Sequence, residues 1–89
     1  SPSEVNLMEQ KIKAIIELIE AVVSDSSVPK NIRKALAEAK ARLQQKEDAT
    51  VRVSAAIYLI EPISEDVNMP PHARTQIWGI ISALESIKN

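Results

Sequence analysis

The 89-residue sequence contains no cysteine and no phenylalanine, and it has one residue each of glycine, tryptophan, tyrosine and histidine. Without cysteine the chain forms no disulfide and offers neither thiol catalysis nor a zinc–thiolate site. A single glycine provides almost no material for tight β-turns or for a phosphate-binding loop. These scarcities favour an all-α domain and exclude several classes of enzyme.

The net charge and the short apolar runs argue against nucleic acid and membranes as partners. The formal net charge is −1 at pH 7, so the chain as a whole has no attraction for nucleic acid or for an anionic membrane. The longest apolar runs, such as residues 55–60, are much shorter than the ~18 residues that span a bilayer. The first residues lack the features of a signal peptide. We therefore expect one cytoplasmic domain over residues 1–89, with no membrane association.

Apolar residues recur at steps of three and four in four segments, which is the pattern of amphipathic helices. We expect the first helix over residues 4–24, capped by Ser3, and the second over residues 29–45, with Pro29 in its first turn. Asp48 should cap the third helix, which Pro62 should kink or end. The fourth should begin at Pro70 and fray at residues 88–89.

The sequence repeats itself at a shift of 41 residues. Nine of the 30 positions in residues 14–43 are identical to those in residues 55–84, and both prolines that precede a helix coincide. We interpret this as two copies of a helical hairpin, over about residues 4–45 and 48–88, that bury each other's apolar faces. The predicted fold is an antiparallel four-helix bundle made of two tandem hairpins.

Two families share features with this chain. The 41-residue unit, with its turn Asp, Pro and apolar–Arg pair, is weakly similar to a HEAT-type repeat. Residues 16–19, 27–33 and 68–78 resemble more closely uncharacterised protein family 0147, a group of small archaeal helical proteins. That resemblance implies an archaeal four-helix domain with no assigned activity, and it implies no site.

Each predicted corner between helices contains an aspartate, a proline and an arginine. We expect them to brace the loops, with Asp accepting backbone N–H groups and Arg tying the next helix to the turn. The alternative is a site at which the two arginines bind an anion in a shared cleft. The six corner residues are Asp25, Pro29, Arg33, Asp66, Pro70 and Arg74.

No catalytic constellation is evident, so we expect no enzymatic activity, no cofactor, no metal site and no small-molecule substrate. His72 is the single histidine and should be a surface residue without a nucleophile–base partner. Trp78 should lie either at the edge of the core or at an interface. Gly79, in the middle of a helix, indicates that another group packs closely there, because glycine costs about 1 kcal/mol relative to alanine.

Two functions fit these observations. The first is a non-enzymatic protein-interaction module, self-associating as a homodimer or binding another protein, because the last two helices have a wide apolar surface that includes Tyr58 and Trp78. The alternative is an RNA- or ribonucleoprotein-associated adaptor that uses basic residues of the second helix, although no aromatic residue interleaves them. The basic candidates are Lys30, Lys34 and Lys40.

Overall fold

A computed structural model describes residues 2–88, with side chains from Ser3 onward. It has four α-helices and one short 3₁₀ turn, and no strand occurs within the described range. The elements are α1 (Pro2–Val23), α2 (Lys30–Leu43), α3 (Ala49–Ile60), the 3₁₀ turn η1 (Glu61–Ile63) and α4 (Pro71–Lys88). The predicted four-helix fold is confirmed.

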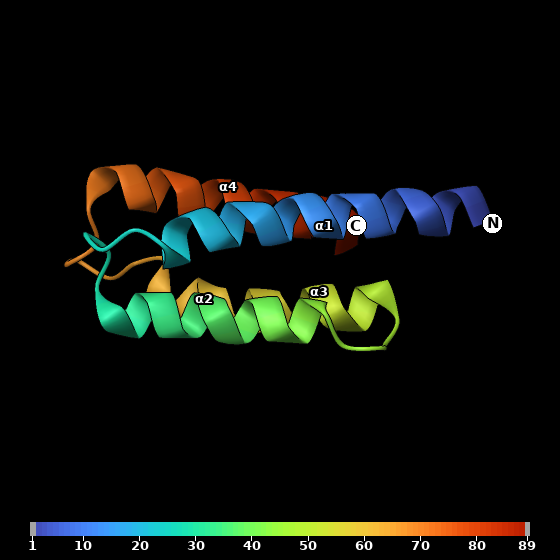
Figure 1. The fold of residues 1–89 in the computed structure, drawn as a ribbon, viewed down its shortest axis with the longest axis horizontal. Coiled ribbons are helices and arrows are strands. Elements are labelled where there is room, and N and C mark those ends of the chain that lie inside the picture. Colours follow the sequence, from blue (N-terminus) through green and yellow to red (C-terminus); the bar gives the residue numbers. More distant parts are fainter. Residues whose placement is uncertain (1, 89) are drawn as a thin grey trace.

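The helices form an elongated antiparallel bundle of 42 × 19 × 19 Å (Figure 1). Each helix packs against two neighbours, in the cyclic order α1, α2, α3, α4, so that α1 lies diagonally opposite α3. The α1–α2 and α3–α4 loops meet at one end of the bundle, which we call the corner end. The α2–α3 loop lies at the opposite end, beyond which the start of α1 extends.

The core is made of one buried stripe from every helix. Isoleucine and leucine dominate it, together with valine, alanine and one methionine. The buried apolar residues are Ile12, Ile15, Ile19, Val22, Val28, Ile32, Leu36, Ala39, Leu43, Val53, Ala56, Ile57, Ile60, Met69, Ala73, Ile77, Ile80 and Leu84. The predicted stripes are therefore largely the core, but only from Ile12 onward in α1.

Several helix ends differ from the sequence-based prediction. The first helix begins at Pro2, so Ser3 lies inside its first turn and does not cap it. Pro29 is the N-cap residue of α2, with φ −55° and ψ 146°, and is not its first helical residue. Asp48 occupies the N-cap position of α3, but its side chain makes no capping hydrogen bond. The predicted interruption at Pro62 is the 3₁₀ turn, and the predicted fraying at Asn89 lies outside the described residues.

Gly79 does not have the closely packed environment that its position in the middle of a helix suggests. A Cβ atom built on this residue meets no atom within 4 Å outside its own helix backbone. The prediction that another group packs closely against it is wrong. Gly79 is exposed on α4, where the sequence pattern cannot distinguish close packing from open space.

Candidate functional site

The two corner loops have the same local geometry. Asp25 Oδ1 accepts hydrogen bonds from the backbone N–H of Ser27 at 2.9 Å and from its hydroxyl at 2.6 Å. Asp66 Oδ1 accepts a bond from the backbone N–H of Asn68 at 2.8 Å. In both loops an aspartate satisfies the backbone two residues later, which stabilises a turn by the usual Asx mechanism.

Both corner arginines reach back to their own loops. Arg33 Nε donates to the carbonyl of Val28 at 3.0 Å, and an Nη atom of Arg74 donates to the carbonyl of Asp66 at 3.3 Å. The acceptors are backbone oxygens, so neither guanidinium is directed into a shared anion-binding cleft. Each arginine holds the first turn of the following helix against the loop that precedes it.

The two loops also bind each other. Nε2 of His72 on α4 lies 2.8 Å from Oδ2 of Asp25, while Nδ2 of Asn31 on α2 donates to Oδ2 of Asp66 at 3.3 Å. His72 and Asn31 are related by the 41-residue shift, as are Asp25 and Asp66. Each loop aspartate therefore pairs with the first helical turn of the other half. This reciprocal arrangement fits the interpretation of an internal duplication, which stays a prediction.

The structure brings a serine hydroxyl beside His72, where no nucleophile–base pair was expected. Ser27 Oγ lies 3.3 Å from His72 Nε2, and both residues contact Asp25. The geometry nevertheless differs from that of a catalytic triad, in which the carboxylate binds one ring nitrogen and the serine binds the other. Here the same Nε2 atom faces both groups, and the serine hydroxyl donates its proton to Asp25. His72 therefore cannot serve as the general base for Ser27.

This cluster lowers the pKa of the Asp25 carboxyl to about 2. The largest cause is the hydrogen bond from the Ser27 hydroxyl, followed by those from His72 and from the Ser27 backbone. Each bond favours the ionised carboxylate over the neutral acid. Since a carboxylate only accepts hydrogen bonds, His72 must present a protonated Nε2 to it. The cluster is thus an electrostatic tie between the two halves of the bundle.

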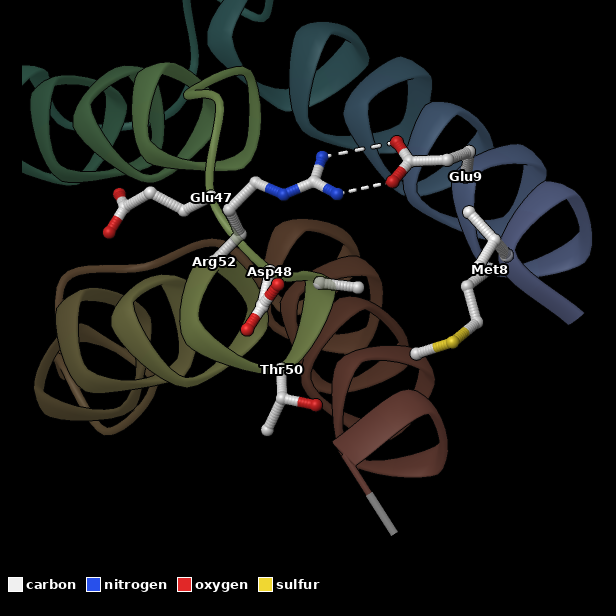
Figure 2. Close-up of a pocket in the computed structure, with 8 residues that line it drawn as sticks. Met8, Glu9, Glu47, Asp48, Thr50 and Arg52 are labelled. Atoms are coloured by element: carbon white, nitrogen blue, oxygen red, sulfur yellow. Dashed lines mark hydrogen bonds and ion pairs between the residues drawn. The ribbon is translucent and has the colours of Figure 1, made fainter. Parts of the chain in front are cut away.

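The one buried charged residue in the described chain is Arg52 of α3, which is 8% exposed. Its guanidinium reaches across the bundle to both carboxylate oxygens of Glu9 on α1, as Figure 2 shows. One Nη atom also donates to the carbonyl of Leu43, the last residue of α2, at 3.1 Å. That carbonyl has no partner within its own helix, and the negative end of the helix dipole favours a cation there. Arg52 therefore links three helices.

The Arg52–Glu9 pair borders a hollow of about 290 Å³ between the start of α1 and the start of α3 (Figure 2). Its apolar wall is formed by Val5, Met8 and Ala49, and its polar wall by Glu9, Glu47, Asp48, Thr50 and Arg52. The carboxylates outnumber the single cation, so an anion would be repelled. The bond to Arg52 lowers the pKa of Glu9, and the bond to Glu9 raises the pKa of Arg52. The chemistry here is that of a structural ion pair.

Sequence reasoning missed this ion pair. A weak signal existed, because Arg52 precedes Val53 and lies one turn before Ala56, both of which are buried. The repeat gave no help, since the equivalent position in the first half is Lys11, which is exposed. The partner, Glu9, is on the helix diagonally opposite, so only the packed bundle brings the two together.

The basic face of α2 is partly neutralised. Lys40 Nζ lies 3.5 Å from a carboxylate oxygen of Glu20, and Arg42 lies 3.9 Å from Glu47. Lys30 and Lys34 are exposed. One of the three lysines that suggested RNA binding, Lys40, is therefore paired with a carboxylate, which weakens their combined attraction for a phosphate backbone.

The two aromatic candidates are both on the surface. Tyr58 of α3 is 81% exposed, and Trp78 of α4 is 58% exposed, so Trp78 does not belong to the core edge. Val51, which is also exposed, lies two helical turns before Tyr58 and therefore on the same side of α3. The outer side of α3 is thus apolar over much of its length.

Tyr58 stands between two hollows on this outer side. One, of about 440 Å³, is lined by Tyr58, Glu61, Pro62 and Glu65. The other, of about 300 Å³, is lined by Arg42, Ala55, Tyr58 and Leu59. We call these seven residues together the Tyr58 surface.

Two other features are absent within residues 2–88. No three histidine or acidic side chains are grouped so that they could hold a metal ion. No described helix is long and apolar enough to cross a lipid bilayer.

Comparison with known proteins identifies the family. Residues 2–87 match the model of a family described as "Uncharacterised protein family (UPF0147)". The chain belongs to the UPF0147 family. This membership confirms the resemblance seen in the sequence, whereas similarity to HEAT-type repeats stays a prediction.

The UPF0147 relatives found are archaeal and similar in length. A UPF0147 protein of Pyrococcus furiosus is 49% identical over 83 residues, covering 91% of this chain and 89% of the relative. One of Methanocaldococcus jannaschii is 43% identical over 81 residues, covering 90% and 87%. The match therefore extends over nearly the whole domain in each case.

Two crystal structures have the same fold. The unknown function protein MMP1188 is 50% identical and gives a TM-score of 0.82, covering 89% of this chain and 91% of that one. A UPF0147 protein from Thermoplasma acidophilum is 32% identical and also gives 0.82, covering 90% and 96%. The bundle architecture is thus shared by chains that are 50% and 32% identical to this one.

Proposed function

We propose that this UPF0147 protein is a non-enzymatic protein-interaction module that docks another protein on the outer side of α3. The observation that carries the proposal is the exposure of Tyr58, at 81%, near the end of a helix side that also exposes Val51. Tyrosine and tryptophan are enriched at interface hot spots because they bury a large area at little entropic cost. Tyr58 lies beside two shallow, open hollows that give this surface relief.

The chemistry of the corner supports a role without catalysis. The Ser27 hydroxyl is committed to Asp25, and His72 meets both residues through one nitrogen atom. A serine activated for attack needs its proton to pass to the histidine. The same groups instead tie the two halves of the bundle together, so their arrangement is explained by stability.

RNA binding is the weaker proposal, because Lys40 and Arg42 are paired with carboxylates. Self-association, which the sequence led us to expect, requires a surface whose shape and charge are complementary to the same surface on a second copy of the chain. The cytoplasmic location expected from the sequence also stays a prediction.

The proposal is tested by affinity capture with three forms of the chain. Wild-type protein, Tyr58→Glu and Leu18→Glu are immobilised and exposed to extract of an archaeon that encodes a UPF0147 protein. Leu18 is the matched control, because it is exposed on α1, which lies diagonally opposite α3. A protein retained by wild type and by Leu18→Glu, but lost with Tyr58→Glu, supports the proposal. Equal retention by all three forms, or no retained protein, counts against it.

Light scattering on the purified chain at micromolar concentration addresses self-association. A dimer that Tyr58→Glu dissociates and Leu18→Glu leaves intact would make the chain its own partner on this side of α3. A monomer at all concentrations leaves a different protein as the partner. Circular dichroism of each variant confirms that the bundle is intact, because both substitutions are at exposed positions.

A further inference from the structure

The first hollow beside Tyr58 has the composition of a site for an organic cation. The carboxylates of Glu61 and Glu65 and the ring of Tyr58 line it, with Pro62 between them. Among the described residues, neither Glu61 nor Glu65 forms an ion pair. A guanidinium or ammonium group entering here would meet two unpaired carboxylates and an aromatic face, which are the groups that bind such cations.

The second hollow suits an apolar side chain. Ala55, Tyr58 and Leu59 line it, together with Arg42. The guanidinium of Arg42 lies 3.9 Å from Glu47, so its charge is partly countered and its aliphatic stem can cover the hollow. Because both hollows include Tyr58, a partner that fills them places a cationic and an apolar group beside the same ring.

The charges around α3 argue against a second copy of the chain as the occupant. Glu47 and Asp48 immediately precede α3, and Glu61 and Glu65 follow its end. A two-fold axis at the centre of α3 brings acidic ends against acidic ends, whether the helices run parallel or antiparallel, and the one cation of the Tyr58 surface, Arg42, already lies 3.9 Å from Glu47. Like charges placed opposite each other disfavour association and suppress wrong partners. Charge complementarity therefore favours a basic partner.

We propose that the Tyr58 surface binds a basic, apolar segment of another protein. An arginine or lysine of that segment lies between Tyr58, Glu61 and Glu65, and an apolar side chain one to two helical turns away enters the hollow of Ala55 and Leu59. The proposal rests on the interaction role given above and adds the chemistry of the partner. Both hollows include Tyr58, so the two partner side chains enter within a turn or two of each other.

The test uses two synthetic helical peptides labelled with fluorescein. Each has 18 residues and a stripe of leucines, with arginines flanking the stripe in one peptide and glutamates at the same positions in the other. Fluorescence anisotropy measures their binding to the wild-type chain, to Tyr58→Ala, to the double variant Glu61→Gln with Glu65→Gln, and to the control Leu18→Ala. Titrations are made at low and at high sodium chloride concentration.

We expect the arginine peptide to bind and the glutamate peptide to bind at least tenfold more weakly. The double glutamine variant and Tyr58→Ala should each weaken the arginine peptide by about fivefold to tenfold, as cation–π contacts and surface ion pairs are individually modest. Leu18→Ala should bind like wild type. Added salt should weaken the wild type more than the double glutamine variant.

Other outcomes overturn the inference in distinguishable ways. Equal binding of both peptides, lost in Tyr58→Ala, would leave an interaction surface whose partner is not basic, and the proposed function would stand. Binding of the arginine peptide that Tyr58→Ala leaves unchanged would place the site elsewhere. Self-association at low salt that the double glutamine variant abolishes would make a second copy the occupant. Binding of neither peptide removes the inference, while affinity capture still decides the proposed function.

Discussion

The ion pair between Arg52 and Glu9 predicts an asymmetric response to mutation. Arg52 is 8% exposed, whereas the side chain of Glu9 is 48% exposed. Removing Glu9 therefore leaves a buried cation without its counterion, but removing Arg52 leaves a carboxylate that water can reach. Glu9→Ala should consequently destabilise the bundle more than Arg52→Met does, although the two residues form a single interaction.

The magnitudes follow from the contacts that are lost. Breaking a fully buried pair by deleting one partner costs about 3–5 kcal/mol, and the half-exposed position of Glu9 lets water enter and reduces this to about 2–3 kcal/mol for Glu9→Ala. Arg52→Met keeps the aliphatic stem and loses the bond to the Leu43 carbonyl, which costs about 1–2 kcal/mol. The double variant should cost no more than Arg52→Met alone. Once Arg52 is replaced, the Glu9 carboxylate has no buried cation to neutralise, so its removal costs nothing further.

Urea denaturation followed by circular dichroism and by Trp78 fluorescence measures these free energies of unfolding. Thermal unfolding provides a second measurement, since 1 kcal/mol corresponds to roughly 4–8 °C in a domain of this size. Glu17→Ala, which removes an exposed glutamate from the same helix, should change stability by less than about 0.5 kcal/mol. If Arg52→Met proves more destabilising than Glu9→Ala, or if the double variant shows the sum of both losses, the reasoning is refuted.

Three other predictions concern single positions. Gly79→Ala should raise the free energy of unfolding by about 1 kcal/mol, because the new methyl group meets open space; a loss of stability in urea denaturation would contradict this. The Asp25 carboxyl, with a pKa of about 2, stabilises the fold fully above about pH 4 and progressively less as pH falls toward 2. Asp25→Asn should therefore lose less stability than wild type between pH 4 and pH 2, and parallel acid titrations of unfolding would disprove that assignment. Leu36→Ala should cost about 2–5 kcal/mol and Leu7→Ala almost nothing, since Leu36 is buried in the core and Leu7 is exposed near the start of α1; similar thermal shifts would contradict this.

The regular parts of the fold were predictable because they depend on local spacing. Three- and four-residue steps of apolar residues identified four helices and most of the core. Proline placement located the starts of α2 and α4 to within a residue or two, because proline restricts its own φ and the conformation of the residue before it. The helix ends that were misplaced, at Ser3 and Pro29, involve one or two residues whose capping depends on local backbone angles.

The candidate site was less predictable. Tyr58 and Trp78 were recognised as candidates, but their exposure follows from the direction each helix presents to its neighbours. The contacts of His72 with Asp25 and Ser27 join residues more than 40 positions apart in sequence. No local pattern reports such a contact, because it requires two loops to meet at the same end of the bundle.

By itself, the sequence determined that this chain is helical, where the loops between its helices lie, and which side of each helix is apolar. Those properties depend on residues within one or two helical turns of each other. Only the tertiary structure decided which helices are neighbours, that Arg52 is buried against Glu9, and that Gly79 faces open space. The physical reason is that burial and charge pairing belong to the space between elements, which the packing of all four helices creates together.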